Sequence, residues 1–192
     1  MSKTGRRSAG IVMTALVAAV AVTACGESSA DRGGAGSAAA AESGSTQQAA
    51  RPDTTASGLW EYLQEVEYRD EWSLYPGTTE LYEGQEPHGM LLTTYVNSRA
   101  HEAISGTSGQ LPDGAVVIKE NFRPDSALAA ITVMYKRDGY DPEHNDWYWV
   151  KYLPDGSVDN GGKASGRVPG CINCHGGMAD NDYIMTGSLD GQ

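Results

Sequence analysis

The sequence is poor in positive charge. Its 192 residues include 14 Lys and Arg against 25 Asp and Glu, which gives a formal net charge of -11. Three of the cations, Lys3, Arg6 and Arg7, stand at the very start of the chain. An acidic surface argues against nucleic acid and anionic lipid as direct partners, because both repel negative charge. It would suit a basic redox protein as a partner.

Cysteine and histidine are also scarce, with three and four residues. Cys171 and Cys174 form a CxxC pair, and no second pair occurs. A structural zinc site would therefore need ligands that the cysteine spacing does not supply. The histidines away from this pair stand singly. His88 is interpreted as a strand-edge residue, with a ligand as the alternative, His101 lies on a short helix, and His144 lies in a polar loop.

No apolar run is long enough to span a membrane comfortably. The longest, from about residue 11 to residue 22, follows the three cations and ends in small residues before Cys25. We therefore predict a secretory signal peptide over residues 1–24. Val22 to Cys25 is typical of a bacterial lipobox, whose cysteine is diacylated, although a signal peptide with a chance cysteine is the alternative. The expected location is an exported protein anchored by lipid to the cell membrane.

Residues 26–57 contain no aromatic and no large aliphatic side chain. Such a segment cannot bury enough apolar surface to offset its chain entropy, so we predict a disordered tether over residues 25–57. All ten tyrosines and all four tryptophans follow it, within residues 58–192. That length predicts one ordinary domain.

Hydrophobic patterns in the domain are short, and strands outnumber helices. Helical spacing of apolar residues predicts a helix over 58–68 and a shorter one over 97–105, capped by Asn97 or Ser98. Alternation predicts four strands: 88–97, 115–122, 127–136 and 147–153, with residues 138–146 as a loop. We therefore predict an α+β fold, mainly an antiparallel β-sheet with peripheral helices.

Cys171, Cys174 and His175 form the sequence CxxCH. This spacing is that of c-type haem attachment, in which each thiol bonds one vinyl group and the adjacent imidazole ligates iron. A zinc site and a redox disulfide are the alternatives, but a disulfide does not need the histidine. We predict one covalent haem c at the C-terminal end of the fold.

The sulfurs that follow His175 are Met178 and Met185. Met178 is so close to His175 that the chain would have difficulty crossing the ring edge to reach the other face of the haem. We therefore expect a five-coordinate iron with His175 proximal. An open position favours binding of, or redox chemistry on, a small molecule.

Several segments resemble the cytochrome P-460 family, which includes the cytochromes c-prime-beta. They are Pro87 to Gly89, residues 93–100, 111–122 and 131–156, and the final CxxCH, so that the resemblance covers nearly the whole domain. It implies a mostly antiparallel β fold, a homodimer, one covalent haem c near the C-terminus, and a five-coordinate iron.

The resemblance also implies two functional classes. The P-460 enzymes oxidise hydroxylamine and bond a lysine to their haem, whereas the c-prime-beta proteins bind nitric oxide or carbon monoxide without this activity. The matching lysine is Lys119, which shares a strand face with Ala115 and Val117; a surface lysine is the alternative. The enzymes also use a distal carboxylate as a proton acceptor, but no Asp or Glu occurs over residues 127–136, and Thr132 stands near the matching position.

Further pocket residues can be proposed from the strand patterns. A distal pocket lined by Ile131, Val133, Met134 and Phe122 would be apolar and would favour diatomic ligands. Arg123 or Arg167 could pair with the haem propionates. Aromatic strand residues could line the haem or belong to the core: Tyr135, Tyr148, Trp147 and Trp149. The sequence thus predicts either a haem oxidoreductase acting on hydroxylamine or a related nitrogen species, or a non-catalytic gas-binding protein.

Overall fold

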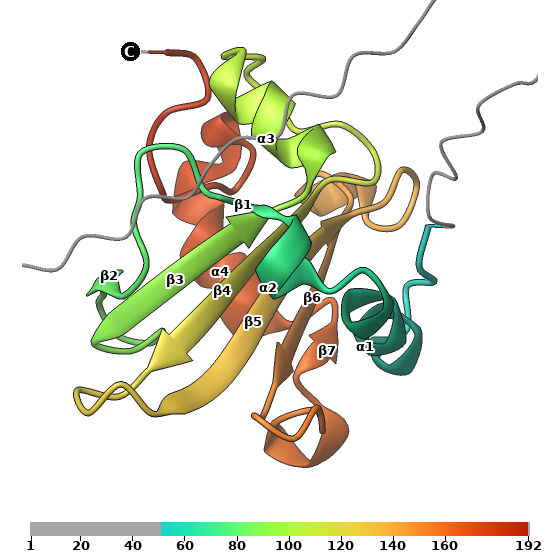
Figure 1. Ribbon diagram of the computed structural model, residues 1–192. Helices are drawn as coiled ribbons and strands as arrows, with labels where there is room; N and C mark the ends of the chain where they lie inside the picture. The colour runs from blue at the N-terminus through green and yellow to red at the C-terminus, as the bar shows by residue number, and fades with distance from the viewer. Residues whose placement is uncertain (1–50, 192) are drawn as a thin grey trace, which may run out of the picture. The chain divides into compact units, whose positions relative to one another are not determined.

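The computed structural model describes residues 51–191 (Figure 1). The predicted signal peptide, the predicted lipidation site Cys25 and most of the predicted tether lie outside the described residues. The end of that tether segment is described, and there Thr55 caps helix α1 (Ala56–Glu65) by accepting a hydrogen bond of 3.1 Å from the Gly58 amide. Within residues 51–191, no helix is both long and apolar enough to cross a membrane.

An antiparallel sheet of seven strands forms the body of the fold. Its four long strands lie side by side in chain order: β3 (Leu91–Val96), β4 (Val116–Phe122), β5 (Leu128–Lys136) and β6 (Trp147–Tyr152). These are the four predicted strands, each shifted by at most three residues at an end.

Three two-residue strands extend the sheet at its edges. Both β1 (Ser73–Leu74) and β2 (Tyr82–Glu83) pair with β3, and β7 (Ser165–Gly166) pairs with β6. The sequence analysis missed all three, because two residues give no alternation to detect. The predicted α+β fold with a mostly antiparallel sheet is confirmed.

The helices lie at the periphery of the sheet. The predicted helix over 58–68 is wrong at its end: α1 stops at Glu65, Glu67 takes a left-handed φ of 46°, and a separate turn, α2 (Tyr68–Glu71), follows. Helix α3 (Ser98–Ser105) is capped by Asn97, whose Oδ1 accepts from the Ala100 amide at 3.1 Å.

Helix α4 (Pro169–His175) was not predicted. Three 3-10 helices complete the described structure: Pro142–His144, within the predicted loop, Asn160–Gly162, and Gly176–Asn181 directly after α4.

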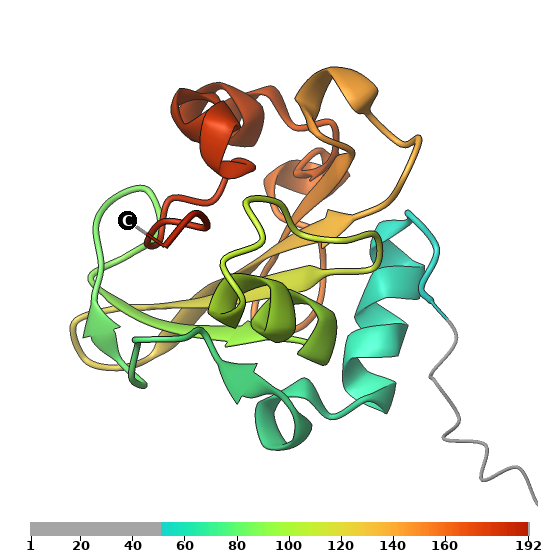
Figure 2. The same ribbon diagram turned by 90° about the horizontal axis from the view of Figure 1, so that it is seen from above.

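Alternate residues of the sheet contribute to two separate cores. In β4, Val116 and Ile118 pack with α1, whereas Val117 packs with α3 and the C-terminal segment. Figure 2 shows the C-terminal segment, in red, and helices α1 and α2 on opposite sides of the sheet. The predicted alternation along this strand is confirmed.

The same alternation corrects part of the predicted distal pocket. Ile131 was expected to line it but packs in the core on the α1 side, where it has no exposed surface. The side chain of Val133 belongs to that core as well, although the residue borders the cavity on the other face. The prediction was wrong because it assigned residues from both faces of β5 to one pocket, whereas successive strand residues point to opposite faces. Tyr135 and Tyr148 also pack on the α1 side.

Candidate functional site

A cavity of about 640 Å³ lies on the α4 side of the sheet. Its walls come from strands β4, β5 and β6, from the turn before β3, from α4 and from residues 184–186. The volume lies within the roughly 300–1,000 Å³ of small-molecule and cofactor sites.

Helix α4 presents the CxxCH sequence to this cavity. Pro169 occupies its first turn, where a fixed φ favours the helix and a missing N–H costs nothing. The free thiols of Cys171 and Cys174 border the cavity together with His175, which ends the helix and is only 8% exposed. No three potential ligands among residues 51–191 converge on one metal ion. All three side chains of the CxxCH sequence nevertheless border the one cavity.

His175 is held in one orientation by the chain that follows it. Its Nδ1 lies 2.8 Å from the carbonyl oxygen of Tyr183, and because a carbonyl can only accept, Nδ1 carries the hydrogen. The lone pair is then on Nε2, the arrangement typical of a metal-ligating histidine. Burial lowers the pKa of His175, which favours the neutral form that binds metal. The ring of Trp149 packs against His175 with a centroid distance of 4.8 Å.

A buried ion pair fixes the segment that carries the Tyr183 carbonyl. Asp182 accepts from Lys136 Nζ at 2.5 Å, from Asn145 Nδ2 at 3.0 Å and from the Leu111 amide at 2.8 Å. The carbonyl of Asp182 accepts from the Trp147 indole at 3.0 Å. Both charged side chains are almost fully buried. Lys136 is the last residue of β5, so the position of His175 depends on contacts at that end of the strand.

The register of the sheet aligns the polar residues of the opposite wall. Thr94, Lys119, Thr132 and Lys151 are direct cross-strand neighbours on β3, β4, β5 and β6, and all four border the cavity. The two sequence candidates, Lys119 and Thr132, are thus adjacent. Burial lowers the pKa of Lys119, and no carboxylate among residues 51–191 forms an ion pair with it.

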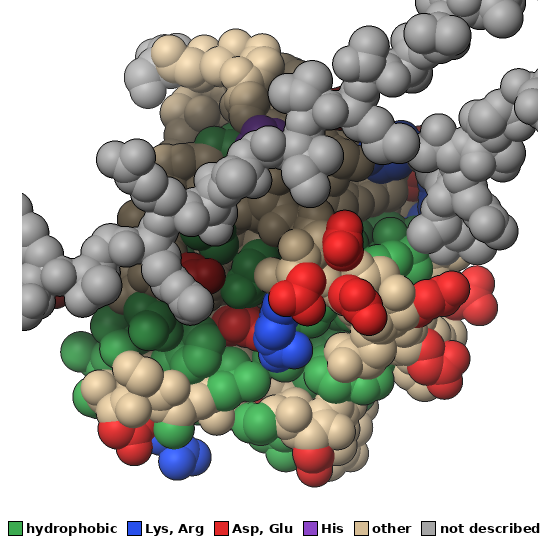
Figure 3. Space-filling view, in the orientation of Figure 1, with side chains coloured by type: hydrophobic (Ala, Val, Ile, Leu, Met, Phe, Trp, Pro, Cys, Tyr) green, Lys and Arg blue, Asp and Glu red, His purple; other side chains and the backbone are tan. Residues whose placement is uncertain are grey.

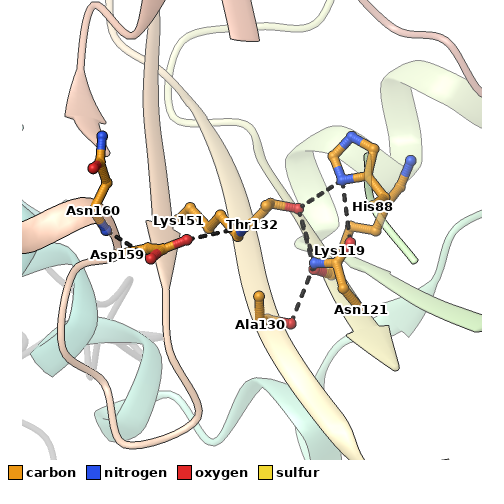
Figure 4. A network of polar contacts seen from close by, with 8 residues as sticks. All are labelled: His88, Lys119, Asn121, Ala130, Thr132, Lys151, Asp159 and Asn160. Carbon is orange, nitrogen blue, oxygen red and sulfur yellow. Dashed lines mark hydrogen bonds and ion pairs between the residues drawn. The ribbon is translucent and has the colours of Figure 1, made fainter. Parts of the chain in front are cut away.

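His88 also belongs to the cavity wall. Figure 4 shows its ring beside Asn121 and Thr132. Its Nδ1 lies 3.1 Å from Asn121 Oδ1 and 3.4 Å from Thr132 Oγ1. The Asn121 amide nitrogen donates to the carbonyls of Lys119 and Ala130, so Oδ1 is the atom that faces His88. Burial, with a smaller contribution from the charge of Lys119, lowers the pKa of His88 to about 4.

The interpretation of His88 as a strand-edge residue was wrong. The residue precedes β3 in a turn, and the turn brings its ring over the cavity face of β4. Asn121 was missed too, although it lies two residues after Lys119 and must share its face. The predicted apolar pocket is therefore corrected: Phe122 and Met134 do border the cavity, but beside a polar group of His88, Lys119, Asn121 and Thr132.

Comparison with known proteins places this geometry in a family. A model of the cytochrome P-460 family matches residues 67–186, which include all strands of the sheet and α4. The chain belongs to the cytochrome P-460 family. Cytochrome P-460 proteins are c-type haem proteins. No curated protein gives a significant match to the chain.

The residues of the cavity fit the haem c of the cytochrome P-460 family. Besides the two thiols and the free Nε2 of His175, the cavity wall contains Trp149, and Trp149 Nε1 is the buried side-chain polar atom that lacks a hydrogen-bond partner among residues 51–191. Buried donors are normally paired, so this N–H fits an acceptor that occupies the cavity, such as a carboxylate.

The two arginine candidates for a haem carboxylate differ in position. Arg123 is exposed and borders the cavity. Arg167 does not border it: its Nε lies 3.3 Å from Asp141, and its guanidinium lies over the ring of Tyr140. Arg123 is therefore the better placed of the two for a cytochrome P-460 haem.

Proposed function

We propose that this protein is an exported c-type cytochrome that carries out redox chemistry on hydroxylamine or a related small nitrogen species. Haem c bound in the cavity supplies an iron that binds small ligands and exchanges electrons. Cys171 and Cys174 would hold it through thioether bonds, and His175 Nε2 would ligate the iron. The observation that supports the proposal is the placement of Lys119 next to Thr132 across the cavity from CxxCH.

The polar wall supports a polar substrate. Thr132 Oγ1 and the side-chain amide of Asn121 form a hydrogen-bonded polar wall within one cavity, and Lys119 adds an amine without a carboxylate partner among the described residues. Because burial lowers the pKa of Lys119, more of its amine is unprotonated, and only an unprotonated amine can form a covalent bond to another group.

A second candidate function is reversible capture of nitric oxide or carbon monoxide without turnover. It is favoured by the side chains that β5 presents to the cavity, which are Ala130, Thr132 and Met134 and include no carboxylate. Oxidation of hydroxylamine releases protons, so an enzyme needs an acceptor for them near the substrate. A protein that only captures a gas needs no such proton acceptor.

Mass spectrometry of the haem-bearing tryptic digest, combined with a hydroxylamine oxidation assay, separates the two functions. The redox proposal predicts a peptide containing Lys119 joined to the haem peptide, with loss of both the crosslink and the turnover in Lys119→Met. The exposed Lys163, changed to Met, is the matched control and should leave both unchanged. Haem attached only through Cys171 and Cys174, without turnover, would favour gas capture, and a protein without haem would refute both.

The proposal includes export and a lipid anchor on Cys25, which rest on the sequence pattern alone. Metabolic labelling with a fatty acid should mark the full chain and not Cys25→Ala, while retention of label in Cys25→Ala would contradict the anchor. A homodimer is proposed from the family resemblance, and sedimentation of the haem-loaded domain tests it.

A further inference from the structure

Two histidine rings approach each other within the cavity. His88, from the turn before β3, and His175, from the end of α4, have ring centroids 6.0 Å apart, and their planes are inclined by 87°. The two residues are far apart in the sequence and come from different walls of the cavity. This proximity is therefore a product of the fold.

In both rings Nδ1 is hydrogen-bonded and Nε2 is free, within residues 51–191. His175 Nδ1 donates to the Tyr183 carbonyl, and His88 Nδ1 faces the Asn121 carbonyl oxygen, so each ring uses Nδ1 as its donor. Each Nε2 then carries a lone pair and has no hydrogen-bond partner among the described residues. An acceptor oxygen at Nδ1 and a free Nε2 are what metal-ligating histidines typically show.

The distance between the rings distinguishes two roles for His88. Metal–imidazole bonds are about 2 Å long, so two imidazoles on opposite sides of one metal ion have centroids about 6 Å apart. A histidine that only formed a hydrogen bond to a metal-bound small molecule would lie farther away by roughly the 3 Å of that hydrogen bond. The observed 6.0 Å agrees with the first arrangement.

We propose that His88 Nε2 is the second axial ligand of the haem iron in the resting protein, opposite His175. The inference rests on the proposed function, since it requires a haem in the cavity, and it replaces the expected five-coordinate iron with a six-coordinate one. A small substrate or gas enters by ligand exchange: its lone pair takes the place of the His88 lone pair, and no electron is transferred in this step.

The surroundings of His88 suit a ligand that can leave. The residue lies in a turn, is only partly buried, and is held through Nδ1 by contacts of 3.1 Å and 3.4 Å. His175, by contrast, is buried on a helix and its hydrogen bond is shorter, at 2.8 Å. His88 is therefore the weaker-held of the two, and access to the distal position depends on its displacement.

Electron paramagnetic resonance and visible spectra of the haem-loaded, oxidised full chain test the inference. The wild type and the control variant His101→Ala should give a low-spin signal, and His88→Ala should lose it and become high-spin. Added imidazole should restore the low-spin signal of His88→Ala. A high-spin wild type, or a low-spin His88→Ala, would overturn the assignment.

Binding of cyanide provides a second readout that does not depend on turnover. Cyanide can bind only to the fraction of the protein in which His88 has left the iron, and this fraction reduces the apparent affinity of the wild type for cyanide. His88→Ala should therefore bind cyanide at least about tenfold more tightly than wild type. Equal binding would contradict the inference. If His88→Ala fails to load haem, His88→Met replaces it, and its low-spin signal should differ from that of wild type. A chain without haem would refute the proposed function, whereas a haem-loaded, high-spin wild type would refute only the role of His88.

Discussion

Asp182 links the buried charge of the domain to the orientation of His175. It accepts three hydrogen bonds through its carboxylate, and the next residue supplies the carbonyl that holds His175 Nδ1. Removal of one partner from a buried ion pair is strongly destabilising, because it leaves a desolvated charge without its counter-ion. Asp182 is thus a positioning residue for the histidine and also a structural one.

Replacement of Asp182 by Asn should destabilise the domain by about 3–5 kcal/mol, because Lys136 would keep a buried charge without a counter-ion. Urea unfolding of the haem-loaded protein measures this, with Asp180→Asn, at an exposed position, as the control. The double variant Asp182→Asn with Lys136→Met should recover part of the loss. If the double variant were as unstable as Asp182→Asn alone, an unpaired Lys136 charge would not be the cause.

At the scale of elements, the register of β4 against β5 determines the cavity wall. The sequence predicts both strands and the face that Lys119 occupies, since alternation is a local signal. It does not predict that Thr132 is the direct partner of Lys119, because register depends on how the strands pair. His88 begins a predicted strand but lies in the turn before β3, and its place over Asn121 depends on the path of that turn, which only the tertiary structure shows.

Helix α4 shows the same limit for the C-terminal segment. The helix contains proline, glycine, two cysteines and a histidine, and these residues form no hydrophobic repeat from which a helix can be predicted. The CxxCH spacing nevertheless predicted which three side chains would border one cavity. Motif spacing thus located the candidate site, whereas the shape of the opposite wall required long-range contacts.

Asn97 connects α3 to the sheet. Its Oδ1 accepts from the amides of Ala100 and Val116, at 3.1 Å and 3.2 Å, and its Nδ2 donates to the Gly114 carbonyl at 2.8 Å. Asn97→Ala should therefore cost about 2–3 kcal/mol, from a lost cap and from buried polar groups left unpaired. Asn97→Asp keeps the acceptor and should lose less. Equal unfolding free energies for Asn97→Ala and the exposed control Ser98→Ala would contradict this role.

At the scale of the whole molecule, one cluster of acidic side chains lies away from the cavity. Figure 3 shows acidic side chains gathered over the face that carries α1 and α2, and the exposed acids there include Glu65, Glu67, Asp70 and Glu71. The cavity and α4 belong to the opposite face of the sheet. A basic redox partner attracted by these acids would therefore approach the face that lacks the cavity, and net charge alone does not direct it to the haem site.

Buried tyrosines on both faces make the stability of the domain sensitive to alkali. Burial raises the pKa values of Tyr68 and Tyr152 in the α1-side core, and it raises the pKa of Tyr75, on the cavity side, to about 12. Tyr75 is 4% exposed and donates to the Thr186 carbonyl. In the unfolded chain the same hydroxyls ionise near pH 10.

Because the folded state holds the Tyr75 proton more tightly, its contribution to stability is complete below pH 10 and is lost as the pH rises through 12. The wild type should therefore lose at least about 2 kcal/mol of unfolding free energy between pH 10 and pH 12, since each unit of pKa difference corresponds to about 1.4 kcal/mol. Tyr75→Phe should be less stable than wild type at pH 8, through the lost hydrogen bond, but should fall less steeply above pH 10. Urea unfolding at pH 8, 10, 11 and 12 measures both slopes. Parallel slopes for the two proteins would show that the ionisation of Tyr75 does not contribute, and the alkaline loss would then have to come from the tyrosines of the α1-side core.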